Sequence, residues 1–218
     1  MFAQTPQRDR ADQYNKLAPR YDKLHNRWLR HAGGEAQAAL EALVRALATP
    51  DTALLDAGCG TGNLARRLIA EGMPTKAMTL LDPSVSMLAR CADIPVPKIE
   101  GRLEALPFGD CAFDIVTCVW ALETVPNPGL ALTELCRVVR PGGVLCLAFC
   151  ADMPARGLTD SLMRRALLYR GTGQFLSRRH VIDTIENIAG FKVRTIPSNG
   201  PAATLLAKRA IETVTDPI

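Results

Sequence analysis

Residues 54–65 read Leu-Leu-Asp-Ala-Gly-Cys-Gly-Thr-Gly-Asn-Leu-Ala, and this stretch decides the fold class. An apolar run ends in Asp56, a glycine-rich turn follows, and an amphipathic pattern begins, which predicts a strand, a tight loop and a helix. Gly58, Gly60 and Gly62 let the backbone take positive φ angles and approach a ligand without an intervening Cβ. The free N–H groups at the start of the helix then point toward whatever the loop holds.

A second acidic residue, Asp82, ends the apolar run 78–81, twenty residues after Gly62. An acid at this spacing accepts hydrogen bonds from both hydroxyls of a ribose. The glycine spacing G-x-G-x-G differs from the dinucleotide fingerprint, and no Lys-Ser/Thr pair follows as in a P-loop. Asp56 would be unfavourable beside a pyrophosphate but favourable beside the ammonium and sulfonium groups of S-adenosylmethionine. The pattern therefore favours S-adenosylmethionine over a nicotinamide cofactor.

Composition excludes several protein classes. The chain has 218 residues, 48% of them hydrophobic, which suits one domain of ordinary size. The net charge of +4 is too small for a dedicated nucleic-acid binder, so no nucleic-acid partner is expected. Seven cysteines without a C-x-x-C pair indicate reduced thiols in the cytoplasm, and three histidines without ligand spacing predict no metal site. No apolar run approaches the roughly 20 residues that span a bilayer.

Hydrophobic periodicity predicts an α/β fold. Helices are expected over 6–31, where Pro19 should divide the helix and Gly33-Gly34 should end it, and over 35–48, 84–92, 128–139, 158–169 and 178–189. A strand–loop–helix unit is expected over 52–71, and strands over 76–81, 96–100, 113–119, 144–150, 191–196 and 202–208, with residues 140–143 as the stop of the helix 128–139. Alternating strands and helices predict a Rossmann-like, seven-stranded, mostly parallel sheet with helices on both faces. The short loop before the last strand requires an antiparallel C-terminal hairpin.

Several motifs occur in the order typical of one enzyme family. They are Leu55-Asp56-Ala57-Gly58-Cys59-Gly60-Thr61-Gly62, Asp82-Pro83-Ser84, Glu104-Ala105-Leu106-Pro107-Phe108, Phe113-Asp114, and residues 134–143. In these motifs the chain resembles the class I S-adenosylmethionine-dependent methyltransferases. Within that class it looks most like the type 11 group, which includes the ubiquinone/menaquinone-biosynthesis C-methyltransferases. The resemblance covers roughly residues 50–150 and concerns the cofactor more than the acceptor.

The resemblance implies roles for the residues of the cofactor site. Asp56 and the backbone of the glycine loop would hold the methionine and ribose side, and Asp82 would take the ribose hydroxyls. Pro83 and Met87 would flank the adenine, and the backbone N–H of Leu103 would meet an adenine nitrogen. The remaining residues assigned to this site are Glu104, Val119 and Trp120. Arg102 stands where the family usually has an Asp that accepts from the adenine amino group, and a guanidinium has no acceptor.

An N-terminal segment, residues 1–34, is interpreted as a helical lid over the methyltransferase domain, residues 35–218. Tyr14 and Tyr21 lie in a Tyr-x-x-x-Ala-x-x-Tyr-Asp-like pattern, and related enzymes use such a segment to cover the cofactor. The alternative is that both tyrosines only pack a helix face. Residues 151–180 are expected to form a substrate cover.

Two residues are candidates for a catalytic base. Glu123 follows the predicted strand 113–119, where it would face the substrate, or else be a solvated residue at a strand end. His25 lies in the proposed lid, where an ordinary surface role is the alternative.

The methyl acceptor is expected to be a small, amphiphilic molecule, either quinone-like or a phospholipid. Two basic segments, 1–31 and 156–179, would bring the protein to the surface of an anionic membrane, although a solvated basic helix face explains the same pattern. The protein is thus expected in the cytoplasm, at most peripheral to a membrane. The competing hypothesis is a protein that binds S-adenosylmethionine without catalysis.

Overall fold

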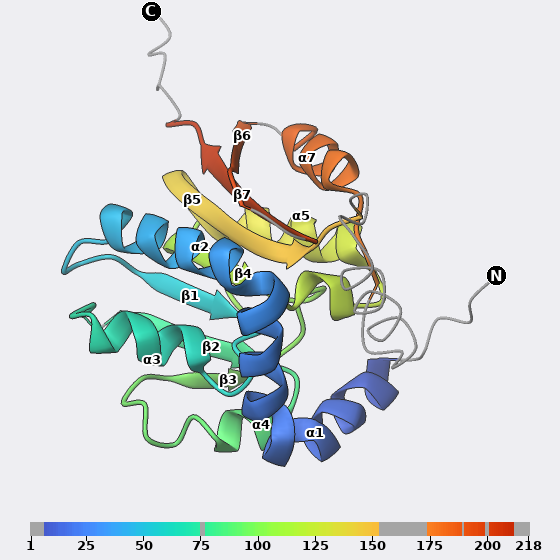
Figure 1. Cartoon of the computed structure of the whole chain (residues 1–218). Helices are drawn as coiled ribbons and strands as arrows, with labels where there is room; N and C mark the ends of the chain where they lie inside the picture. Colours follow the sequence, from blue (N-terminus) through green and yellow to red (C-terminus); the bar gives the residue numbers. More distant parts are fainter. Residues whose placement is uncertain (1–6, 75–76, 153–173, 189, 199–200, 212–218) are drawn as a thin grey trace, which may run out of the picture.

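The computed structural model describes residues 7–74, 77–152, 174–188, 190–198 and 201–211. Its centre is a seven-stranded sheet in the order β3-β2-β1-β4-β5-β7-β6 (Figure 1). The strands are β1 Leu54–Ala57, β2 Met78–Asp82, β3 Lys98–Glu100, β4 Phe113–Val119, β5 Val139–Cys150, β6 Phe191–Ile196 and β7 Ala202–Arg209. Strands β3, β2, β1, β4 and β5 are parallel, whereas β7 is antiparallel to both β5 and β6. The predicted α/β architecture and its antiparallel C-terminal hairpin are confirmed.

Helices cover both faces of the sheet (Figure 1). On one face, α2 Gly34–Leu47 and α3 Asn63–Ala70 pack on a cluster that includes Leu54, Leu80 and Ile115. On the other face lie α5 Pro128–Val138 and α7 Arg178–Glu186. The short helix α4, Val85–Ala89, follows β2. The alternation of Leu54 and Leu55 between the two clusters is the period-two pattern of a strand buried on both faces.

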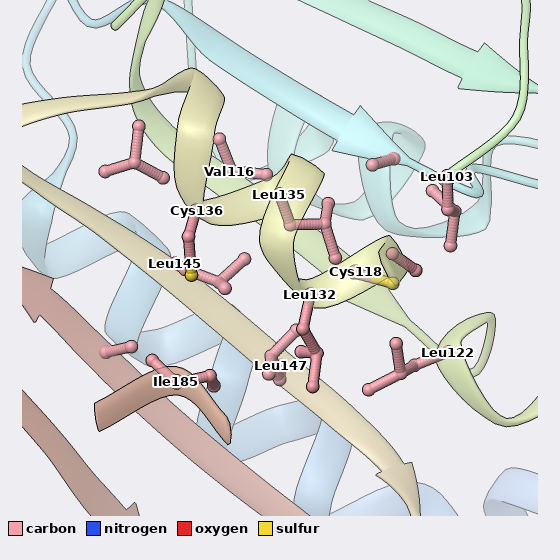
Figure 2. Close-up of a cluster of buried hydrophobic side chains, with 14 of the residues drawn as sticks. Leu103, Val116, Cys118, Leu122, Leu132, Leu135, Cys136, Leu145, Leu147 and Ile185 are labelled. Atoms are coloured by element: carbon pink, nitrogen blue, oxygen red, sulfur yellow. The ribbon is translucent and has the colours of Figure 1, made fainter. Parts of the chain in front are cut away.

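Leucines of α5 fill the second core cluster, which Figure 2 shows in close-up. Leu132 and Leu135 are at most 1% exposed and lie against Leu145 and Leu147 of β5. Asn127 caps α5 by accepting a hydrogen bond from the Leu130 N–H at 3.0 Å, and Pro128 occupies the first turn, where its missing N–H costs nothing. This rigid layer supports the ends of β4 and β5, where the site is built.

The N-terminal helices differ from the prediction. Helix α1 runs without interruption from Gln7 to Trp28 with Pro19 inside it, and its path bends (Figure 1). Proline removes one helical hydrogen bond and clashes with the preceding turn, which accounts for a bend but here does not end the helix. The predicted stop at Gly33-Gly34 is also wrong, because a π-helical turn, η1 Leu29–Gly33, leads directly into α2.

The C-terminal end of α5 holds another correction. Residues 140–143 were expected to stop this helix, and α5 does end just before them, at Val138. The strand expected from residue 144, however, begins at Val139 and continues through Pro141-Gly142-Gly143 with an irregular register against β4. The Arg209 guanidinium donates to the Val139 carbonyl at 2.7 Å and so holds this start in place. The predicted helix 158–169 lies outside the described residues. No helix among the residues described is long and apolar enough to cross a bilayer.

Candidate functional site

Three neighbouring cavities lie where the parallel strands β1, β2 and β4 end. This edge is where open α/β sheets bind ligands. The largest has a volume of about 750 Å³ and is named the acceptor cavity for its expected role. The second borders Pro83 and the third borders Asp56, and these are named the adenosine cavity and the methionine cavity for the parts of the cofactor expected there. Tyr21 and Trp120 line all three cavities and therefore stand at the place where they meet.

Asp56 ends β1 with one carboxylate oxygen engaged and one not. Its Oδ1 accepts a hydrogen bond from the Thr117 hydroxyl at 2.9 Å, whereas Oδ2 is buried and has no hydrogen-bond partner in the described structure. Burial raises the pKa of Asp56 to about 7, and the charge of Asp82 adds to this, while the Thr117 hydrogen bond opposes it. A buried carboxyl in this state is stabilised by a cationic ligand.

Asp82 holds the glycine loop and the start of α4 together. Its Oδ2 accepts from the Gly60 N–H and its Oδ1 from the Ser84 N–H, both at 2.9 Å. Burial raises the pKa of Asp82 to about 6, opposed by these two backbone hydrogen bonds. A carboxylate offers about four lone-pair sites, so Asp82 retains acceptor capacity for ligand hydroxyls at the wall of the adenosine cavity.

The glycine loop approaches both the core and helix α1. Gly58 has a φ of 76°, and a Cβ built there would lie 2.4 Å from the Cβ of Ala121. At Gly60, a Cβ would lie 3.6 Å from the ring of Tyr21. Both glycines line the adenosine cavity. Gly62 instead begins α3 against Ile94, and it and Glu104 are not among the residues lining the three cavities.

The remaining residues predicted for the cofactor lie on the cavity walls. Pro83, Met87 and Leu103 line the adenosine cavity together with Tyr14 and Tyr21. Val119 lines the methionine cavity beside Trp120. Burial raises the pKa of both tyrosines, so they are neutral phenols. They line cavity walls and also contact each other edge to face, with ring centroids 6.3 Å apart. Arg102 pairs with Ala105 in an isolated bridge and lines none of these cavities.

Three polar residues of α1, whose contacts sequence reasoning missed, tie this helix to the same edge of the sheet. Asp22 accepts from the Thr61 hydroxyl and, at 3.0 Å, from the Asn63 amide. The Asn15 amide oxygen accepts from the Ser84 hydroxyl at 2.7 Å. Arg10 donates to the Thr124 carbonyl. Each pair is separated by at least 39 residues, and no local sequence pattern announces such contacts.

Glu123 is the buried acid of the acceptor cavity. It is 4% exposed, so the alternative of a solvated strand-end residue is wrong. Its Oε1 accepts from the Cys150 N–H at 3.1 Å, and its Oε2 is buried without a hydrogen-bond partner among the described residues. Burial raises the pKa of Glu123, opposed by backbone hydrogen bonds. The carboxyl therefore has one free oxygen and an enhanced affinity for a proton.

His25 lies across the same cavity, from α1. It is 8% exposed, which rules out the alternative of an ordinary surface histidine, and its ring stacks on Tyr21 with centroids 5.5 Å apart. Burial lowers the pKa of His25 to about 4, and the charge of Arg67 adds to this, whereas the charge of Asp22 and a hydrogen bond with the Gln37 side chain oppose it. At neutral pH the imidazole is therefore uncharged. The other walls of the cavity are largely aromatic and aliphatic, formed by Tyr14, Leu17, Tyr21, Leu24, Trp28, Trp120 and Phe175, whereas Arg20 and Lys23 are exposed at its rim.

The donor set of these cavities fits S-adenosylmethionine. The orphaned oxygen of Asp56 matches an ammonium group, and two adjacent buried acids favour a ligand with two positive centres. The adenosine and methionine cavities hold only about 60 and 20 Å³, room for one or a few water molecules, and both share Tyr21 and Trp120 with the larger acceptor cavity. In the part of the chain that the structure describes, no group of three His, Cys, Asp or Glu side chains could hold a metal ion.

Comparison with known proteins agrees with this geometry. The family model described as a methyltransferase domain matches residues 55–147. The ubiquinone/menaquinone biosynthesis C-methyltransferase UbiE of Methylobacterium nodulans is 31% identical to the chain, over 98% of the chain and 88% of that protein. The UbiE protein of Brucella abortus is 29% identical over 93% of the chain and 78% of that protein.

Solved structures share the fold at low sequence identity. A possible histamine N-methyltransferase of Thermotoga maritima superposes with a TM-score of 0.68 at 20% identity, covering 90% of this chain and 98% of that one. The [4+2]-cyclase SpnF gives 0.62 at 21% identity, with coverages of 79% and 80%. The same fold thus serves different chemistries, and the relatives of similar length decide between them. The chain belongs to the S-adenosylmethionine-dependent methyltransferases, in the group of the ubiquinone/menaquinone biosynthesis C-methyltransferases.

Proposed function

We propose that the protein transfers a methyl group to a ring carbon of a hydroxylated, prenyl-bearing aromatic acceptor of the quinol type. The observation that carries this proposal is a buried carboxyl, Glu123, in an aromatic cavity that adjoins the cofactor cavities. A volume of about 750 Å³ lies within the usual range for small-molecule sites. It accommodates an aromatic ring and the first part of a prenyl tail, with the rest leaving through the mouth beside Arg20 and Lys23.

Glu123 is proposed as the general base. The cofactor supplies an electrophilic methyl group and a neutral thioether leaving group. A ring carbon needs help to act as a nucleophile, because its electron density rises only when the neighbouring hydroxyl loses its proton. The free Oε2 of Glu123 accepts that proton, and the raised pKa of Glu123 brings its basicity closer to that of the hydroxyl. Neutral His25, which lines the same cavity, is proposed to orient the ring, and the aromatic walls exclude water.

For the cofactor itself, the proposed roles follow the cavity walls. Asp56 binds the ammonium group through Oδ2, and Asp82 binds the ribose hydroxyls. Pro83, Met87 and Leu103 surround the adenine. Tyr14 and Tyr21 close the site from α1, which supports the division into an N-terminal lid, residues 1–34, and a methyltransferase domain, residues 35–218. Most of the proposed cover 151–180, and of the basic segment 156–179, lies outside the described residues.

The quinol acceptor is distinguished from a phospholipid by what surrounds the buried acid. A phospholipid headgroup requires cationic or N–H donors for its phosphate, whereas the described walls around Glu123 are mainly aromatic and aliphatic. Arg20 and Lys23 at the rim are placed to meet an anionic membrane surface from which a prenylated acceptor is drawn.

The test is methyl transfer from radiolabelled S-adenosylmethionine to a short-chain prenyl naphthoquinol, with vesicles containing phosphatidylethanolamine as the competing acceptor. Glu123→Gln keeps the shape and should lower kcat by about 100-fold or more, while S-adenosylhomocysteine binds as before. His25→Gln should mainly raise KM. Because the carboxylate is the active form, wild-type kcat should fall as the pH drops through the raised pKa of Glu123. Label in the phospholipid alone, or full activity of E123Q, would refute the proposal.

A further inference from the structure

Trp120 adopts an unfavourable backbone conformation at the junction of the three cavities. Its φ is 57°, in the left-handed region that residues with a Cβ rarely occupy. Such outliers persist only where surrounding contacts hold them, and they gather at functional sites. The Trp120 N–H donates to the Ala148 carbonyl at 2.8 Å, which anchors its backbone to β5. The contacts of its side chain therefore decide where the indole lies between donor and acceptor.

The indole ring is held by the N-terminal helices. Trp28 of α1 meets it edge to face, with ring centroids 5.6 Å apart and an interplanar angle of 83°. A Cβ built on Gly33 would lie 2.9 Å from Cζ2 of Trp120, so the π-helical turn touches the ring directly. The one hydrogen-bonding atom of the indole, Nε1, donates to Oε1 of Gln37 at 2.8 Å.

Gln37 is itself fixed in orientation. It is 2% exposed, and its Nε2 donates to Oε1 of Glu41 at 2.8 Å, one helical turn further along α2. A carboxylate accepts only, so it directs the amide nitrogen of Gln37 toward itself and the amide oxygen toward Trp120. Glu41 in turn lies 3.7 Å from the Arg67 guanidinium of α3. One ion pair and two hydrogen bonds thus connect α3 through α2 to the indole, and Gln37 also lines the methionine cavity.

We propose that Gln37 is a positioning residue for methyl transfer, which acts by holding the Trp120 indole as the wall between the methionine cavity and the acceptor cavity. It touches neither reacting atom in this role. Its side chain also hydrogen-bonds His25, and Trp120→Phe separates the two contacts because it leaves both Gln37 and His25 in place. Without its amide oxygen the indole loses its hydrogen bond and turns about its side-chain torsions, so the acceptor ring is no longer pressed toward the methyl donor. Because the alignment of reacting atoms controls rate steeply, a small displacement lowers kcat more than it affects cofactor binding.

The experiment compares Gln37→Leu with two variants. Thr204→Val is the matched control, because the Thr204 hydroxyl donates to the Ala36 carbonyl at 3.0 Å and so anchors the same helix to β7 without contacting Trp120. The double variant Q37E/E41Q exchanges the two side chains. The carboxylate at position 37 then accepts from the indole, and the amide at position 41 donates to that carboxylate. Kinetics use the prenyl naphthoquinol and therefore rest on the proposed function. Two other measurements do not depend on the proposed function. They are the exchange of the Trp120 indole Nε1–H resonance, which Trp28→Phe assigns, and the binding of S-adenosylhomocysteine.

Q37L should lower kcat by about tenfold, change the S-adenosylhomocysteine Kd by less than about threefold, and let the Trp120 indole N–H exchange rapidly with water. T204V should lower the Tm but leave kcat and indole exchange unchanged. Q37E/E41Q should restore the wild-type kcat and the slow exchange of the Trp120 indole N–H. If Q37L does not fold, Trp120→Phe removes the same donor and should reproduce the kcat loss. The proposal is overturned if Q37L keeps the wild-type kcat and indole N–H exchange rate, or if T204V loses as much kcat as Q37L. It is also overturned if the folded double variant does not recover kcat, or if W120F is fully active. If no variant or wild type methylates the quinol but indole exchange follows this pattern, the acceptor assignment fails and the positioning of Trp120 stands.

Discussion

Cofactor binding should weaken as the pH falls through the pKa of Asp56. In the ligand-free protein, burial raises this pKa to about 7, so close to half of the molecules carry a protonated Asp56 at neutral pH. The ammonium group pairs only with the carboxylate, and binding below the pKa must therefore release a proton. The same raised pKa costs stability without ligand. Native protein binds the extra proton between about pH 4 and 7, so its stability falls as the pH rises through this range, by on the order of 4 kcal/mol.

The expected change in the apparent Kd follows from the proton that Asp56 releases on binding. One proton lost on binding makes the apparent Kd about tenfold larger for each pH unit below 7, which is about tenfold at pH 6. Asp82, with a pKa of about 6, adds a second proton below that value, so the slope steepens further. Asp56→Asn keeps the shape but not the charge. It should weaken binding at pH 7.5 by about 10- to 100-fold and abolish the dependence between pH 6 and 7.5.

Calorimetric titration with S-adenosylhomocysteine measures this directly between pH 5.5 and about 8, where the ligand keeps its ammonium charge. Repeating each titration in two buffers of different ionisation enthalpy counts the protons released. Thr117→Val provides a second test, because it removes the hydroxyl that donates to Asp56 Oδ1 at 2.9 Å and so raises the pKa of Asp56 further. In T117V the rise of the Kd toward low pH should then begin at a higher pH. Thr117→Ser keeps the hydroxyl and should leave the pH dependence of the Kd unchanged.

Two results would refute this reasoning. The first is an S-adenosylhomocysteine Kd that stays constant from pH 5.5 to 8 while circular dichroism shows the protein folded. The second is a D56N variant with the wild-type pH profile, which would assign the titration to another group.

Two structural predictions concern the loop and the core. Gly58→Ala should raise the S-adenosylhomocysteine Kd by at least tenfold and lower the Tm, because the added Cβ meets Ala121 at 2.4 Å in a left-handed backbone. Gly109→Ala is the control: its Cβ enters open space, so neither the Kd nor the Tm should change. A normal Kd in G58A would show that the loop relaxes. Leu135→Ala should cost about 2–5 kcal/mol of unfolding free energy in denaturant titrations, since Leu135 is fully buried, with kcat at low temperature retained; a loss below 1 kcal/mol would mean that the layer collapses around the gap.

Sequence patterns predicted the sheet well where one local property decides the structure. The strands 113–119 and 191–196 match β4 and β6 to the residue, because apolar or β-branched runs there end in turn residues. Pro19 and Gly33-Gly34 failed as helix breakers because packing outweighs local propensity. Gly33 has to be small where Trp28 and Trp120 meet, and the helix continues through it to present that contact.

At the candidate site, too, local patterns gave a signal and long-range contacts did not. Asp56 and Asp82 were predicted because they sit at the ends of strands next to a glycine loop, a pattern contained in a few residues. Gln37 gave no signal, since a glutamine in an alanine-rich helix is usually solvated, and its partner Trp120 is 83 residues away. Thr117 was invisible for the same reason, being a β-branched residue of a strand whose hydroxyl meets Asp56 61 residues earlier. Polar positioning contacts arise from topology, and the sequence carries no local mark of them.

The contacts of α1 link these observations to how the cofactor enters. Arg10, Asn15 and Asp22 bind the loops that follow β4, β2 and β1, so one helix closes the whole ligand edge of the sheet. In the proposed cofactor site, part of the gross binding free energy would be spent on moving Tyr21 and its neighbours away from the two small cavities. Asp56 and Asp82 would offset that cost, because their unfavourable burial is relieved when a cationic ligand binds. The cofactor affinity would then be the difference between the relief of two buried acids and the displacement of side chains of α1. This difference makes the pH dependence of binding a sensitive probe of the site.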